Sequence, residues 1–383
     1  MYSCKAMLFA TREAHNVKYI LTIFLLSLLI HFPSCTPTGI GQSRYVNSSS
    51  IHNYQPRSNL GTDKHHIAKA RYSAVDIHCH WGLDQDPEKL IEAMDQRGIQ
   101  QAVNLSGDWG LKLEQILTKF HGYAPDRFII FCSPDFNLID QPDFGQRMEK
   151  FLANAHAKGA RGVKIYKNLG LRIKDKSGKL VPVDDPRLDP IWAKAGNLGM
   201  PVLIHTADPA AFFKPTDRFN ERWLQLERRP NWSFHDTQYP SRSELLAQRN
   251  RVIARHTNTI FIGAHVANNA EDLRSVGALM DQFDNLYVDI AGRVAELGRQ
   301  PYSARQFFIT YQDRILFGTD RFPGRPDQPR YRIYFRFLET MDEYFDYYDH
   351  PFPPTGEWKI YGIGLSDKVL EKIYTLNAQR IFK

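Results

Sequence analysis

Short apolar runs alternate with segments of helical spacing along most of the chain, eight times after Tyr72. Each run is five residues long and has the composition of a strand buried on both faces of a parallel sheet. The predicted strands are Ala74–His78, Gln101–Leu105, Phe128–Cys132, Gly162–Tyr166, Pro201–His205, Phe261–His265, Leu286–Ile290 and Ile315–Thr319.

The segments between these runs carry apolar residues three and four positions apart, as in an amphipathic helix. Asp86-Pro87 is typical of a helix start, and Met148, Leu152 and Ala155 form one of the apolar stripes, which we interpret as core. Eight such units over about 310 residues predict a closed (β/α)8 TIM barrel. An open doubly wound sheet is the alternative, although no glycine-rich phosphate turn follows the first run.

Three connections are longer than plain crossovers: Leu171–Val183, Ala207–Ser241 and Arg321–Glu357. The first alternates around Lys176–Gly178 and predicts a hairpin. All three leave the C-terminal ends of predicted strands, where barrel enzymes place their active sites. We therefore expect long βα loops that roof the catalytic face.

The first 70 residues follow a different pattern. Tyr19–Ile30 is an apolar run of twelve residues, whereas a membrane span needs about 20, so it fits a signal peptide. Phe32–Cys35 resembles a lipoprotein cleavage box in which Cys35 is lipidated. We expect residues 1–35 to be a lipoprotein-type signal peptide, with plain secretion or a retained anchor as alternatives. Residues 36–70 are polar and are interpreted as a flexible linker, which leaves 71–383 for the barrel.

Composition excludes some classes of partner. The formal net charge is +7, but no cluster of lysine and arginine is dense enough to indicate nucleic-acid binding. We expect an exported protein, lipid-anchored in the cell envelope or free in the periplasm or medium, that meets membrane only through that anchor. A homo-oligomer remains open.

The four cysteines match no zinc knuckle or disulfide framework, and Cys79 and Cys132 are expected as buried thiols.

Polar residues stand at the ends of four predicted strands. His78 and His80 end the first strand, and residues two apart point to the same side, so both aim into the barrel mouth. The fifth, sixth and eighth strands end in His205, His265 and Asp320. Imidazole and carboxylate groups that gather at the catalytic face of a barrel predict a shared metal site.

This pattern resembles the amidohydrolase superfamily, in particular its amidohydrolase-related (family 2) branch. The resemblance covers about residues 72–383 and is strongest in Asp76–His80, Pro201–Thr206, Gly263–His265, Phe317–Asp320 and the closing helix at Val369–Tyr374. It implies one divalent ion, zinc or manganese, with ligands His78, His80, His205 and Asp320. It also implies that Asp320 is catalytic and that His265 is a catalytic or substrate-polarising histidine.

The fourth strand leaves more than one role open. Some members of the superfamily have a carboxylated lysine there that bridges two metals, and Lys164 occupies this strand. We expect one ion, and we assign Lys164, Tyr166, Lys167 and Arg321 to substrate binding. Asp289 on the seventh strand either holds a ligand histidine or makes a structural hydrogen bond.

The resemblance implies a metal-dependent hydrolase that uses activated water on an amide, ester, lactone or related bond of a small molecule. Asp320 can accept the proton of that water. The same residues also support non-oxidative decarboxylation of a small carboxylic acid, because the fold does not choose between the two reactions. A binding lipoprotein with a degenerate site is a third possibility, which the intact ligand set disfavours.

Overall fold

The structure is a computed structural model that describes residues 57–320, 330–348 and 354–382. Contacts divide the chain into two units, Met1–Leu60 and Gly61–Lys383, and the features below belong to the second. Within it, eight parallel strands are paired in the order of the sequence. The strands are β1 (Ala74–Cys79), β2 (Ile99–Asn104), β3 (Phe128–Cys132), β4 (Gly162–Ile165), β5 (Val202–Ile204), β6 (Phe261–Gly263), β7 (Leu286–Asp289) and β8 (Ile315–Leu316).

Backbone hydrogen bonds between the first and last strands close this sheet. The amide of Ile77 donates to the carbonyl of Phe317 at 3.0 Å, and the amide of Asp320 donates to the carbonyl of His78 at 2.8 Å. The fold is therefore a (β/α)8 TIM barrel, as predicted, and the open doubly wound sheet is wrong. Because barrel closure joins β1 to β8, it also brings His78 beside Asp320.

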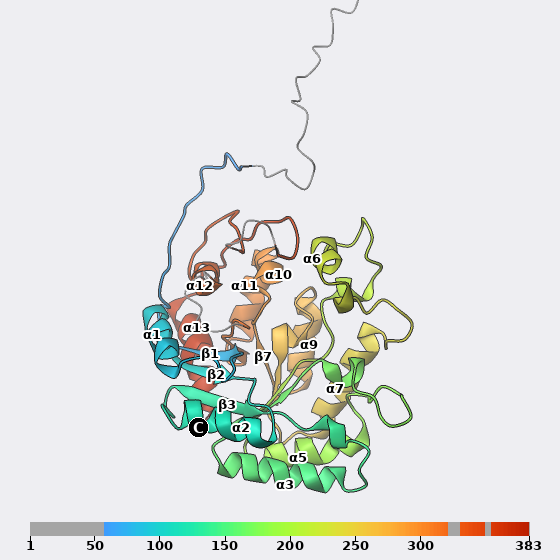
Figure 1. The fold of residues 1–383 in the computed structure, drawn as a ribbon. Coiled ribbons are helices and arrows are strands. Elements are labelled where there is room, and N and C mark those ends of the chain that lie inside the picture. Colours follow the sequence, from blue (N-terminus) through green and yellow to red (C-terminus); the bar gives the residue numbers. More distant parts are fainter. Residues whose placement is uncertain (1–56, 321–329, 349–353, 383) are drawn as a thin grey trace, which may run out of the picture. The chain divides into compact units, whose positions relative to one another are not determined.

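Helices surround the strands, as Figure 1 shows for α1, α3, α5, α7, α9 and α11. The helices are α1 (Pro87–Arg97), α2 (Gly110–Ile116), α3 (Phe144–Ala157), α4 (Asn168–Leu171), α5 (Asp189–Asn197), α6 (Trp223–Arg228), α7 (Arg242–Arg255), α8 (Ala264–Ala267), α9 (Leu273–Gln282), α10 (Val294–Gly298), α11 (Pro301–Thr310), α12 (Arg330–Glu339), α13 (Asp367–Glu371) and α14 (Asn377–Ile381). Shorter 3₁₀ turns are η3 (Phe136–Leu138), η4 (Pro186–Leu188), η5 (Ala210–Phe213) and η6 (Pro230–Trp232), and η2 (Leu117–His121) and η7 (Lys372–Leu376) are π-helical.

All eight predicted strands are present, and most ends agree within two residues. The larger difference is at β8, which stops at Leu316, three residues earlier than predicted. The buried Asp76 carboxylate explains this early end, because it accepts hydrogen bonds from the Thr319 amide at 3.1 Å and the Thr319 hydroxyl at 2.6 Å. Thr319 near the end of the run therefore binds a side chain of β1, and the amide of Phe317 donates to the carbonyl of Ile373 at 3.1 Å instead of to a neighbouring strand.

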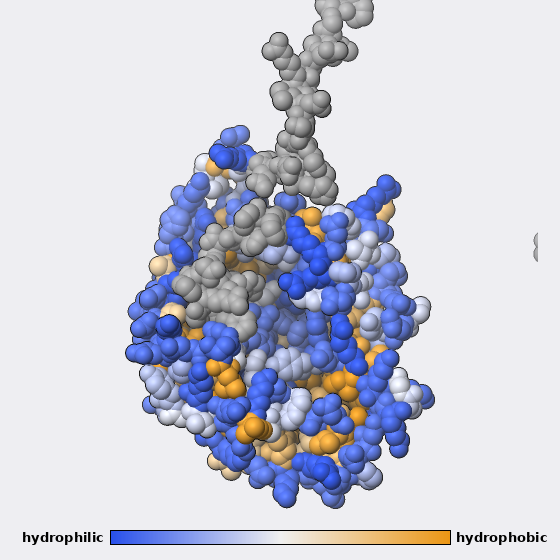
Figure 2. Space-filling view, viewed as in Figure 1, coloured by the Kyte–Doolittle hydropathy of each residue, from blue (hydrophilic) through white to orange (hydrophobic). Residues whose placement is uncertain are grey.

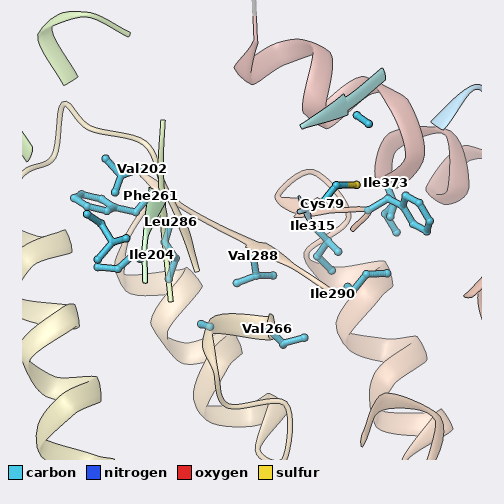
Figure 3. Packing of buried hydrophobic residues seen from close by; sticks show 14 of the residues in the cluster. Cys79, Val202, Ile204, Phe261, Val266, Leu286, Val288, Ile290, Ile315 and Ile373 are labelled. Carbon is cyan, nitrogen blue, oxygen red and sulfur yellow. The ribbon is translucent and has the colours of Figure 1, made fainter. Parts of the chain in front are cut away.

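The hydrophobic core has two layers. Val202, Ile204 and Val288 belong to the cluster between the strands and the helices, part of which is drawn in Figure 3. Alternate residues such as Leu203 and Ile262 form a second cluster inside the barrel. Polar residues that share the inner face must then lie above this second cluster, at the barrel mouth.

The described surface is largely polar on the face drawn in Figure 2, where apolar residues form separate groups. In the part of the chain that the structure describes, no helix has the length and apolar character of a membrane span.

Cys79 and Cys132 are buried free thiols, as predicted. Burial raises the pKa of the Cys132 thiol to about 12, so it stays protonated near neutral pH.

The long connections differ in what they form. Lys174 and Leu180 make an antiparallel bridge, which confirms the predicted hairpin. The connection after β5 contains η5, α6 and η6, and its apolar residues Phe212, Leu226 and Phe234 cluster with one another. These apolar side chains therefore stabilise the loop itself. Within the linker range expected from the sequence, Ala70 is buried and the His65 ring lies 2.5 Å from Asp342.

Candidate metal centre

The two histidines at the end of β1 are held by hydrogen bonds on the same ring nitrogen. Nδ1 of His78 lies 2.8 Å from Oδ2 of Asp289, and Nδ1 of His80 lies 2.8 Å from the hydroxyl of Ser106. Each Nε2 is left to face the barrel mouth, 3.5 Å from Oδ1 of Asp320 in both cases. Ile77, the residue before His78, packs inside the barrel. The register of β1 shifts between Asp76 and Cys79, and this irregularity interrupts the alternation of the strand at His78.

Asp320 follows β8 with a left-handed backbone, φ 60°. Its neighbour Thr319 is anchored to Asp76, which also accepts a hydrogen bond from the Tyr331 hydroxyl of α12 at 2.7 Å. Burial raises the pKa of Asp76 to about 6, against these hydrogen bonds, which lower it. The buried Asp76 thus fixes the backbone that presents the Asp320 carboxylate to both histidines.

His205 and His265 complete the group from β5 and β6. Nδ1 of His265 lies 2.7 Å from the carbonyl of Ala291; since a carbonyl only accepts, this nitrogen carries the proton and Nε2 carries the lone pair. That Nε2 lies 3.3 Å from Nδ1 of His205. Nε2 of His205 is buried, 3.5 Å from Oδ1 of Asp208, and makes no hydrogen bond among the described residues.

A left-handed turn follows β6. His265, Val266, Ala267 and Asn268 have φ between 52° and 58°, and none of them is glycine. A left-handed conformation costs an L-residue about 1–2 kcal/mol, and it is an outlier for a β-branched residue such as valine. Strain of this kind persists only where surrounding contacts impose it, and it concentrates at functional sites.

A positive φ explains a glycine beside the turn. Gly292 has φ 64°, and a Cβ placed there would lie 3.4 Å from Oδ2 of Asp320 and 3.6 Å from Nδ1 of His265. The chain after β7 therefore passes close to both side chains. Ala291, which precedes this glycine, supplies the carbonyl that holds the His265 ring.

Burial favours the neutral form of the four histidines. The pKa of His78, His80, His205 and His265 lies well below the usual value in each case, chiefly because burial disfavours the charged ring. The positive charge of Lys164 is the next cause for the first three. All four rings are therefore neutral near pH 7, and neutral imidazole is the form that binds metal ions.

The arrangement fits a divalent ion. One donor atom from each of His78, His265 and Asp320 lies within 4.8 Å of the other two, and His80 and His205 adjoin this trio through the 3.5 Å and 3.3 Å contacts. Nitrogen donors with a carboxylate suit zinc and related ions. The buried Nε2 of His205 gives independent support, because a coordinated ion would satisfy a polar atom that lacks a hydrogen bond among the described residues.

The four residues assigned to substrate binding differ in their surroundings. Lys164 is buried, 1% exposed, and its Nζ has no hydrogen-bond partner among the described residues. Tyr166 donates its hydroxyl to the carbonyl of Leu105 at 2.7 Å. Lys167 lies 2.5 Å from Oδ2 of Asp208. Arg321 lies outside the described residues. Of the three described residues, Lys164 is therefore the one whose hydrogen-bond donor remains available to a ligand.

The sequence alone indicated neither Ser106 nor Asp208. For Asp289 it left two interpretations open, a support for a ligand histidine or a structural hydrogen bond. Asp289 holds His78 through Oδ2, and its Oδ1 accepts from the amides of His265 at 2.7 Å and Ala291 at 3.0 Å. Ser106 follows β2 closely and Asp208 stands three residues after His205. Their position just past a strand end was the available signal.

A cavity of about 460 Å³ is lined by residues that follow β5, β6 and β7, among them Phe219, Glu271, Glu296 and Arg299. This volume is within the range of small-molecule sites. Its lining comes from loops that follow strands on the same face of the barrel as the histidines, and none of the four histidines is among the lining residues.

Fold and site together define a TIM-barrel enzyme with a candidate metal centre at the C-terminal ends of its strands. The chain belongs to the amidohydrolase family, whose model matches residues 116–383. No curated protein matches the chain.

Several solved structures share the fold. The 2,6-dihydroxybenzoate decarboxylase from Rhizobium is 15% identical, with a TM-score of 0.52 over 81% of this chain and 98% of that one. The dihydroxybenzoic acid decarboxylase from Polaromonas sp. JS666, with bound manganese and the inhibitor 2-nitroresorcinol, is 14% identical, with a TM-score of 0.53 over 81% and 97%. A putative amidohydrolase from Staphylococcus aureus is 15% identical, with a TM-score of 0.50 over 81% and 99%.

Proposed function

We propose that this protein is a metal-dependent hydrolase of a small molecule, with one divalent ion held by His78, His80, His205 and Asp320. Zinc is the ion that this donor set favours, and manganese is the alternative. The observation that carries the proposal is the position of Asp320. Its side chain is 36% exposed, while Oδ1 lies 3.5 Å from the Nε2 atoms of two buried, neutral histidines. A proton acceptor that water can reach therefore stands directly against the metal-ligating nitrogens.

When bound, the ion supplies Lewis acidity and lowers the pKa of water. Asp320 accepts a proton from the attacking water, since a carboxylate retains lone pairs beyond those used for coordination. His265 enters the reaction as a proton acceptor, because its Nδ1 proton is engaged by the Ala291 carbonyl and its Nε2 lone pair faces the site. It takes at Nε2 the proton that Asp320 accepted from water and returns it to the leaving atom, so both residues end as they began.

Lys164 indicates the charge of the substrate. Its buried ammonium group has no hydrogen-bond partner among the described residues, and burial lowers its pKa to about 8. An anionic oxygen beside this nitrogen would compensate the buried charge. We therefore propose a substrate that carries a carboxylate or a similar anionic group near the reacting bond.

Decarboxylation is the second candidate. Two of the similar solved structures are decarboxylases of dihydroxybenzoate. In such a reaction Lys164 would hold the departing carboxylate, and Asp320 or His265 would protonate carbon. The export that we expect from the N-terminal sequence favours hydrolysis, because an envelope enzyme meets extracellular bonds that need cleavage.

Solvent isotopes separate the two reactions. The metal-loaded protein is incubated in oxygen-18 water with dihydrocoumarin, N-acetyl amino acids and 2,6-dihydroxybenzoate as probes. Hydrolysis incorporates one solvent oxygen into the product, whereas decarboxylation releases carbon dioxide and adds a solvent hydrogen to carbon. An unlabelled product that is one carboxyl group lighter would reject the hydrolase and establish the decarboxylase. Asp320→Asn is the control in both cases, because it removes the proton acceptor.

We further propose that the protein is exported and anchored through lipidated Cys35, which lies outside the described residues. Cys35→Ala should move the protein from the membrane fraction to the soluble fraction. Unchanged fractionation would contradict the lipid anchor.

A further inference from the structure

The left-handed turn that carries His265 needs support from outside. Its own hydrogen bonds, from the Asn268 amide to the Ala264 carbonyl at 2.8 Å and from the Asn269 amide to the Val266 carbonyl at 3.1 Å, close the turn. Right-handed turns make the same kind of bond without steric cost to L-residues. Internal bonds alone therefore do not explain why this segment stays left-handed.

Helix α7 supplies that support through two arginines. Arg249 donates to the carbonyl of Ala267, and Arg242 donates to the carbonyl of Asn268 at 2.5 Å and to the side chain of Asn269 at 2.9 Å. The two arginines are seven residues apart, which places them on one face of the helix. They bind consecutive carbonyls at the end of the left-handed turn.

Arg249 is an unusual residue to bury. It is 2% exposed, and its remaining hydrogen bonds go to the neighbouring Asn250 side chain. No carboxylate pairs with it in the part of the chain that is described. Burial accordingly lowers its pKa to about 9. A buried charge without a counter-charge opposes folding, so its presence calls for a role that a neutral side chain does not fill.

We infer that Arg249 is a positioning residue, which keeps the turn left-handed and thereby holds the Nε2 atom of His265 against the metal centre. A guanidinium group suits this role, since its planar donors fix the direction of the Ala267 carbonyl. The importance of His265 in catalysis rests on the proposed function. The effect of Arg249 on the His265 ring does not.

The test is a long-range ¹H–¹⁵N spectrum of metal-free protein labelled at histidine. The His265 signals are assigned by their loss in His265→Asn. In the wild type they should show the tautomer with the proton on Nδ1, as the bond to Ala291 requires. In Arg249→Met we expect the His265 signals to shift or broaden, while those of His156 on α3 stay in place.

The matched control is Arg251→Met on the same helix, whose guanidinium pairs with Asp184 and Glu244 at the surface. It should leave His265 unchanged. His265 signals that keep their wild-type positions in folded Arg249→Met would overturn the inference. So would an equal change in Arg251→Met, because the effect would then belong to the helix in general.

A rescue distinguishes positioning from general stabilisation. Glycine adopts left-handed backbone without penalty, so Ala267→Gly added to Arg249→Met should return the His265 signals toward the wild type. Failure of this rescue would contradict the inference. Where Arg249→Met does not fold, Arg249→Lys replaces it: one donor remains, and a smaller displacement of the same signals is expected.

Activity provides a second readout once a substrate is in hand. Arg249→Met should lower kcat about 100-fold with little change in KM, the cost of misplacing a catalytic group by about 1 Å. If kcat/KM fell by the same factor only because KM rose, the positioning role of Arg249 would be contradicted. If the hydrolase proposal fails, the spectra of the metal-free protein still decide the role of Arg249.

Discussion

Oδ2 of Asp289 lies 2.8 Å from Nδ1 of His78, although the two residues are 211 positions apart in the sequence. Both are buried, and the other oxygen of the same carboxylate accepts the backbone amide of His265. One carboxylate thus orients a candidate ligand from β1 and the strained turn after β6. Carboxylates in this role fix the ring and raise its basicity toward a metal ion.

Asp289→Asn should therefore weaken metal binding by about 10- to 100-fold, because the amide nitrogen no longer accepts the His78 proton. Competition with a chromogenic chelator measures the affinity. Asp284→Asn, an exposed position just before β7, is the control and should bind metal as the wild type does. Equal affinity in all three proteins would remove Asp289 from the metal site.

Lys164 should make the stability of the metal-free protein depend on pH. Its folded-state pKa of about 8 lies below the ordinary 10.5, so folding carries the penalty of a buried ammonium below pH 8. Stability then rises as the pH increases from 8 toward 10.5, because the unfolded state holds the proton more tightly there. The full difference corresponds to about 3 kcal/mol.

Lys164→Met should accordingly stabilise the metal-free protein near pH 7, abolish turnover and flatten this rise. Denaturant unfolding at pH 7 and pH 9 measures the effect. Lys158→Met, which removes an exposed lysine paired with Glu114, should retain the wild-type dependence. A loss of stability at pH 7 in Lys164→Met would show that the ammonium has a partner in the fold.

The sequence predicted the barrel and the five polar strand ends because both depend on local pattern. Alternation within a strand is enough to aim His78 and His80 the same way, and strand order brings β1 beside β8. The hydrogen bond between Asp289 and His78 depends on how separate strands are staggered, which no local pattern records. The left-handed turn is hidden for a different reason: it contains no glycine that would mark it.

Ala267→Gly tests the strain in that turn. It removes a left-handed alanine, so we expect unchanged stability or a gain of up to about 1 kcal/mol, after allowance for the lost methyl group. Ala155→Gly in helix α3 is the matched control and should lower stability by about 1 kcal/mol or more. Chemical denaturation measures both. Similar losses in the two variants would mean that the turn stores no strain.

His265→Asn separates catalysis from metal binding. The four other residues should keep the ion, while activity falls by roughly 100-fold or more, the scale of general acid–base catalysis. Metal content and turnover are measured on the same sample, with His156→Asn on α3 as the control. Loss of the ion would instead make His265 a ligand, in line with its donor atom lying within 4.8 Å of those of His78 and Asp320.

Elemental analysis of the purified protein tests the central claim most directly. After expression with added zinc or manganese, the wild type should contain about one divalent ion per chain, as expected for a mononuclear catalytic site. A double variant with His78→Ala and Asp320→Ala should contain almost none. No ion in the wild type would contradict the metal centre, and two ions with a carboxylated Lys164 would contradict the mononuclear site.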